Sequence, residues 1–76
     1  MTTLATMKFG QRGRVTAIEG DDEISIRLME MGLTPGVDVT LLGRAPLGDP
    51  LEFELRGYRL SLRRSEAARI EIELTQ

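Results

Sequence analysis

Apolar and polar residues alternate in several short stretches of the chain. The clearest series, in which glutamates separate the apolar positions, lie at 51–55 and 70–74. Alternation of this kind is typical of strands that bury one face. The pattern predicts five strands, at 14–19, 37–44, 51–55, 58–62 and 70–74. In the first of them Ala17 and Ile18 are adjacent, and this break in the alternation suggests a bulge or a twisted end.

One segment has the apolar spacing of a helix instead. Ile24, Leu28 and Met31 lie at i, i+4 and i+7, so they share one helical face. Either aspartate of the pair at 21–22 can cap the first turn. Gly32 suits the left-handed position that follows a last turn, and we therefore expect the helix to run to about Met31.

Turn signals separate these elements. Leu33 is placed to make the apolar contact that follows a helix-ending glycine, and the Pro-Gly pair at 35–36 fits a type II turn. The segment 45–50 holds two prolines, which lack N–H donors, so we expect a shaped loop there. A tight link at 56–57 predicts a hairpin, and Ser65 can cap one further short turn.

These elements predict a mainly β architecture with one helix. Five short strands in an open sheet would leave two exposed edges, which curling into a small barrel largely removes. The helix would then cover one end of the barrel and complete the core. With 76 residues the chain is too short to split, and we expect a single domain over residues 1–76.

The composition excludes most catalytic chemistry. The chain has no cysteine, no histidine and one lysine, Lys8, so it lacks the thiol nucleophile and the commonest general base. We expect a protein that is not an enzyme and holds no cofactor. The beginning of the chain has neither a signal-peptide pattern nor a long apolar run, which favours a cytoplasmic location.

A carboxylate cluster at Asp21, Asp22 and Glu23 is the best candidate for holding a hard cation. Its spacing matches neither an EF-hand loop nor a facial triad. Acidic residues in a first helical turn are expected because of the helix dipole. Capping the helix is therefore the favoured interpretation, and we predict no metal site.

Charge and aromatic content argue against two classes of binding module. A net charge of −2 is unsuited to a general nucleic-acid binder, although arginines gather in the last third of the chain. The aromatic residues are Phe9, Phe53 and Tyr58, and the strand pattern directs the last two toward the core. This leaves too few exposed rings for a polyproline groove or for stacking platforms.

Three blocks of sequence occur in a fixed order. Residues 27–36 read RLMEMGLTPG, residues 45–50 read APLGDP, and residues 60–70 read LSLRRSEAARI. In order and spacing, across nearly the whole chain, these blocks resemble the signature of the FeoA family. The resemblance implies an SH3-like five-stranded barrel that acts beside FeoB, a membrane transporter with a cytosolic GTPase domain, and supports ferrous-iron uptake through protein contact.

That resemblance sets the expected partners. The chain would reach the membrane only through an FeoB-type transporter, would bind no nucleic acid, and could form a weak homo-oligomer through strand edges. The alternative is a metal-responsive regulatory domain that binds iron directly through carboxylates such as Asp21, Asp22 and Glu23.

An exposed apolar patch is the expected contact surface. Met29 lies off the helical stripe, and Leu33 and Leu47 lie in or beside turns. Arg27 and Asp49 could form its polar rim, although local hydrogen bonding explains either one equally well. The residues predicted to bind the partner are Arg27, Met29, Leu33, Pro46, Leu47 and Asp49.

Overall fold

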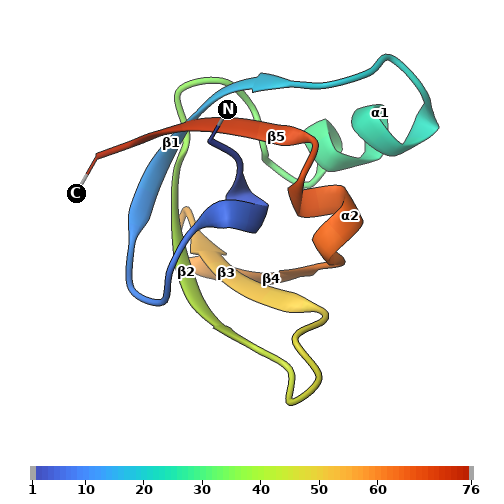
Figure 1. Cartoon of the computed structure of the whole chain (residues 1–76). Helices are drawn as coiled ribbons and strands as arrows, with labels where there is room; N and C mark the ends of the chain where they lie inside the picture. The colour runs from blue at the N-terminus through green and yellow to red at the C-terminus, as the bar shows by residue number, and fades with distance from the viewer. Residues whose placement is uncertain (1, 76) are drawn as a thin grey trace.

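Five antiparallel strands form one strongly curled sheet in the computed structural model, which describes residues 2–75 (Figure 1). The strand order along the sheet is β4-β3-β2-β1-β5. The strands are β1 (Arg12–Ile18), β2 (Asp38–Arg44), β3 (Leu51–Leu55), β4 (Tyr58–Leu62) and β5 (Ile70–Leu74). The predicted five-stranded, mainly β fold is confirmed, and each strand begins and ends within a residue or two of its expected bounds.

Two irregularities in the pairing lie in the central strands. The register between β1 and β5 shifts between Val15 and Ala17, next to the predicted break in alternation. A second shift lies between Leu41 and Gly43, where β2 pairs with β3. An extra residue in one strand bends it and increases its twist. These two positions therefore help the sheet to curl around its core.

The concave face of the sheet and one helix, α1 (Glu23–Glu30), enclose the core. Phe53 is its largest fully buried side chain. Alternate strand residues surround it, as the period of two predicts. The sheet contributes Val15, Val39, Leu41, Leu51, Leu55, Leu62, Ile70 and Ile72, and Leu28 enters from α1.

Both ends of α1 are fixed by local hydrogen bonds. Oδ1 of Asp22 accepts a hydrogen bond from the Ser25 amide at 3.2 Å, so Asp22 is the N-cap. At the other end the Leu33 amide donates to the Leu28 carbonyl at 3.2 Å. Gly32 lies between them with φ of +104°, a conformation that favours glycine. The predicted start and stop of the helix are confirmed.

Two short helices complete the fold. A single 3-10 turn, η1 (Leu4–Thr6), was not expected, and it buries Leu4 completely. The predicted turn after β4 is present as α2 (Arg64–Ala67), but its capping residue is not Ser65. Instead the Arg63 amide donates to Oε1 of Glu66 at 2.9 Å. The helix therefore begins earlier than expected, and Ser65 lies within its first turn.

Tyr58 also departs from its predicted place in the core. Its side chain is 41% exposed, whereas Leu55, its partner across the hairpin, is buried. The Tyr58 hydroxyl donates to the Met31 carbonyl at the end of α1. The ring therefore lies at the surface, with its hydroxyl bound to the helix end.

Candidate partner-binding surface

The structure places five of the six predicted contact residues at the surface, namely Arg27, Met29, Pro46, Leu47 and Asp49. Leu47 is 97% exposed and Met29 is 42% exposed. Leu33 is fully buried, so the prediction that it belongs to an exposed patch is wrong. The turn that ends α1 directs Leu33 into the core, which is the contact expected of an apolar residue after a helix-ending glycine.

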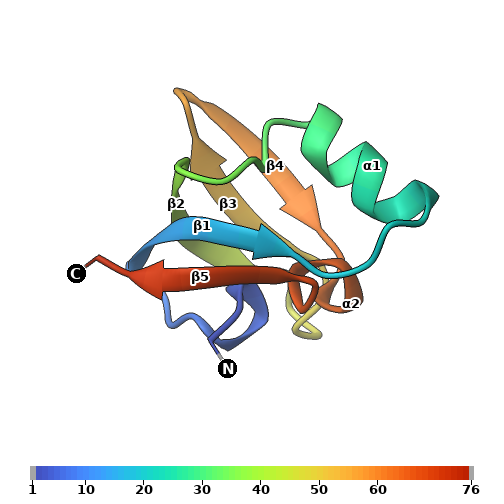
Figure 2. The same ribbon diagram turned by 90° about the horizontal axis from the view of Figure 1, so that it is seen from above.

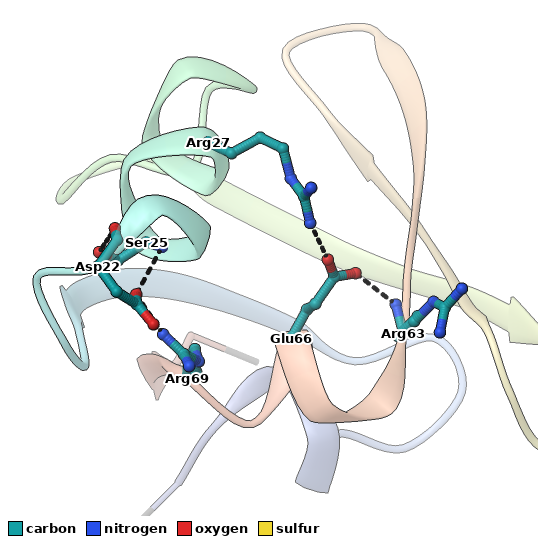
Figure 3. Close-up of polar contacts among 6 residues, drawn as sticks. All are labelled: Asp22, Ser25, Arg27, Arg63, Glu66 and Arg69. Carbon is teal, nitrogen blue, oxygen red and sulfur yellow. Dashed lines mark hydrogen bonds and ion pairs between the residues drawn. The ribbon is translucent and has the colours of Figure 1, made fainter.

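Arg27 connects α1 to α2. Its Nη2 lies 2.6 Å from Oε2 of Glu66, and the other Glu66 oxygen accepts the Arg63 amide (Figure 3). Glu66 thus caps α2 and holds α1 with the same carboxylate. The Arg27 side chain is 59% exposed, so it remains accessible to a partner while it makes this contact.

Asp49 has a similar role in the loop between β2 and β3. Its Oδ1 accepts a hydrogen bond from the Arg64 amide at 2.9 Å, at the start of α2. The Arg64 guanidinium donates in turn to the Gly48 carbonyl at 3.1 Å and to the Ala5 carbonyl at 3.4 Å. The loop is therefore fastened to α2 and, through Arg64, to the N-terminal turn. Leu47 projects from a loop that is held in place.

These contacts build one surface from α1, α2 and the β2–β3 loop. Figure 1 shows α2 between α1 and the loop, and α2 contacts α1 through Glu66 and the loop through Arg64. Met29 and Leu47 consequently stand on elements at opposite ends of this surface, instead of forming one apolar patch. The polar contacts of Arg27 and Asp49 lie between them.

A shallow pocket of about 450 Å³ opens on the same surface. It is lined by Asp49 and Pro50 from the loop, Ser61 from β4, and Arg63 and Glu66 at the start of α2. Both signs of charge and a hydroxyl group face it. Such a lining suits a polar side chain of a partner protein better than an apolar ligand.

The carboxylates at the start of α1 are partly engaged. Oδ1 of Asp22 accepts a hydrogen bond from the Ser25 amide, and the same atom lies 2.6 Å from Nη1 of Arg69 (Figure 3). The hydrogen bond from Arg69, assisted by the Ser25 amide, lowers the pKa of Asp22, and Asp22 in turn raises the pKa of Arg69. Within residues 2–75, no three His, Cys, Asp or Glu side chains come together in a way that could hold a metal ion.

Two further exposed apolar residues lie on α1 and at its end. Ile26 is 49% exposed and stands three positions before Met29, so the two are neighbours on the helix surface. Tyr58 lies at the end of the same helix through its bond to Met31. The spacing of Ile26 and Met29 is a signal in the sequence that could have extended the predicted surface.

Comparison with known proteins identifies the family. The model of the FeoA domain matches residues 2–74. A fusion protein of Porphyromonas gingivalis, an Fe(2+) transport protein A joined to an Fe(2+) transporter FeoB, is 37% identical over 71 residues. That match covers 93% of this chain, and the chain spans only 8% of the length of the fusion protein.

Solved structures agree with this match. An FeoA-like protein from Clostridium acetobutylicum has a TM-score of 0.90 and 35% identity, covering 100% of this chain and 92% of its own. The zinc complex of FeoA from Stenotrophomonas maltophilia, described as a prokaryotic SH3 domain protein, has a TM-score of 0.84 and 28% identity. This match covers 96% of the present chain and 91% of the S. maltophilia chain. Across the described residues, no helix is both long and apolar enough to cross a membrane.

The fold, the order of the sequence blocks and these matches lead to one conclusion. The chain belongs to the FeoA family of non-enzymatic SH3-like domains.

Proposed function

We propose that the protein is a cytoplasmic accessory module of ferrous-iron uptake that binds an FeoB-type transporter and modulates its GTPase or transport cycle. The observation that carries this proposal is the fusion protein, in which a segment similar to this chain is joined to a transporter. Joining two domains in one chain raises their effective concentration for each other, which benefits domains that work in contact. The lack of histidine and cysteine also favours a role through binding.

Leu47 and Met29 are the proposed apolar anchors of this contact. Protein interfaces gain most of their affinity from a few residues, around which the other contacts exclude water. Leu47 suits this role, because its side chain is almost fully exposed. Asp49 and Arg64 also hold the loop that carries it in place. A loop held in its bound shape loses less conformational entropy on association.

The test uses membranes that contain the transporter. GTP hydrolysis and ferrous-iron uptake are measured with and without the full chain, and with the variants Leu47→Asp and Met29→Asp. We expect the wild type to change at least one rate and each variant to weaken the effect, with an apparent affinity lower by about tenfold. Phe9→Asp is the matched control, since Phe9 is 76% exposed but lies in the turn before β1, outside the proposed surface.

Circular dichroism and thermal melting establish that each variant is folded. A wild-type protein that changes neither rate, and is not retained on the transporter, contradicts the proposed function. Equal losses for Phe9→Asp and Leu47→Asp would contradict the proposed surface.

A further inference from the structure

The two ends of the sheet are covered unequally. At the β5 end the N-terminal segment adds backbone contacts, because the Ile72 amide donates to the Thr2 carbonyl at 3.0 Å and Thr3 forms a bridge with Glu71. At the opposite end, β4 pairs with β3 on one side only, and no other strand among the described residues follows it (Figure 2). The outer edge of β4 is therefore the edge of the sheet with which no strand pairs, and α1 lies beside this strand (Figure 2).

The pairing of β3 with β4 identifies the open groups on this edge. The hairpin turns through Arg56 and Gly57, with φ of 50° and 83°, so Leu55 and Tyr58 are its closing pair. In an antiparallel ladder, pairs that exchange hydrogen bonds alternate with pairs that do not. Counting from the closing pair, Arg59 and Ser61 direct their N–H and C=O groups away from β3.

No hydrogen bond from a described residue occupies the outward backbone groups of Arg59 and Ser61. Unpaired groups on an edge strand are a template for another strand. Ser61 also lines the pocket described above, so a chain that follows this edge would reach the pocket.

Charge selects the kind of chain that would fit. The segment 56–64, which spans β4 and both of its flanks, carries Arg56, Arg59, Arg63 and Arg64 and contains no aspartate or glutamate. Arg59 is 72% exposed, and its contact with Glu52 is loose, at 4.0 Å. A second copy of this chain would bring two arginine-rich strands together, and like charges on adjacent strands are destabilising. An acidic segment would be attracted instead.

We propose that the edge of β4 binds an extended acidic segment of the partner protein as an added strand. This inference rests on the proposed function, because it takes the cytoplasmic part of the transporter as the source of that segment. The outward groups of Arg59 and Ser61 supply main-chain hydrogen bonds, and the arginines provide selectivity for acidic side chains.

A peptide experiment tests the edge without the transporter. The probe is a short capped peptide of alternating glutamate and valine, added to the full isotope-labelled chain, and hydrogen exchange is followed by NMR. We expect slower exchange of the Arg59 and Ser61 amides, and no slowing with a peptide in which lysine replaces glutamate. Unchanged exchange at both amides, or equal protection by the lysine peptide, would overturn the proposal.

A second experiment measures retention of the chain on the intact transporter. Arg59→Glu is expected to weaken binding about tenfold at low salt. Arg12→Glu makes the same charge change at an exposed position of β1, and we expect it to bind as the wild type does. Ser61→Pro removes an outward N–H that takes no part in the β3–β4 ladder, and binding should again be weakened.

The outcomes separate this inference from the proposed function. Retention of the wild type, together with equal retention of the folded Arg59→Glu and Ser61→Pro variants, would leave the proposed function standing and overturn the β4 edge as the docking site. Failure of the wild type to bind would contradict the proposed function. The peptide experiment would then decide whether the edge of β4 binds an acidic strand.

Discussion

Asp22 combines two stabilising roles in one side chain. It caps α1 through the Ser25 amide and pairs with Arg69, which precedes β5. The pair joins residues that are distant in the sequence, so it secures the start of α1 to the C-terminal part of the sheet. Both contacts favour the ionised carboxylate, which is why the pKa of Asp22 is lowered.

A pH-dependent contribution to stability follows from this lowered pKa. A group whose pKa is lower in the folded state stabilises the fold above its ordinary value, here 3.8, and loses that contribution as the pH falls through the folded-state pKa. Asp22→Asn keeps a capping oxygen but cannot form the ion pair. We expect its urea midpoint to lie below that of the wild type at neutral pH, with the difference shrinking under acidic conditions.

Asp21→Asn makes the same chemical change at the neighbouring exposed position and serves as the control for that measurement. If the deficit of Asp22→Asn stays constant down to acidic pH, the ion pair does not contribute and capping geometry explains the whole effect.

At the scale of elements, Glu66 couples the two α-helices. Its carboxylate caps α2 and pairs with Arg27 of α1. We expect Glu66→Ala to lower the free energy of unfolding by about 1–2 kcal/mol, since it removes a capping contact and a partly exposed ion pair. Arg27→Ala should cost less than about 1 kcal/mol. Urea denaturation of both variants and of the double variant gives the coupling energy.

We expect a coupling energy of about 0.5 kcal/mol or more between Arg27 and Glu66. The loss of the α2 cap appears separately, in the effect of Glu66→Ala alone. Glu66→Gln is the informative control, because it keeps an acceptor for the Arg63 amide while removing the charge that faces Arg27. Additive effects of the two alanine substitutions would mean that α1 is positioned without this contact.

The elements differ in how far the sequence predicted them. The hairpin of β3 and β4 and the ends of α1 were predictable, because alternation, capping and glycine turns act over a few residues. The turn η1 was not, since three residues contain no period, and its place depends on distant partners such as Arg64 and Ile72. The cap of α2 was misassigned because Glu66, not Ser65, reaches the backbone of Arg63.

The candidate surface was predictable only in part, for a related reason. The exposure of Met29 and Leu47 followed from the helical period and from the turn composition. The separation of these two residues did not, because it depends on α2 packing between their elements. The sequence supported two conflicting expectations for Leu33, one as an apolar contact after the helix and one as an exposed turn residue. The first is the one observed, because burying an apolar side chain is favourable.

At the scale of the whole molecule, burial distinguishes two leucines that the sequence had grouped together. A chain of 76 residues is expected to have a free energy of unfolding of about 4–11 kcal/mol. Leu33→Ala removes a fully buried side chain and should cost about 2–5 kcal/mol, a large part of that total. Leu47→Ala, at a residue that is 97% exposed, should change stability by less than about 0.5 kcal/mol.

The same pair of substitutions separates stability from binding. Urea denaturation at neutral pH measures the first quantity, and retention on the transporter, at a temperature where both variants are folded, measures the second. We expect Leu33→Ala to unfold at much lower urea yet bind normally once folded, and Leu47→Ala to unfold like the wild type but bind more weakly. A stable Leu33→Ala variant would contradict the packing described for the end of α1. Normal binding by Leu47→Ala would remove the loop from the proposed interface, because the loss of an exposed side chain can weaken binding only where that side chain meets the partner.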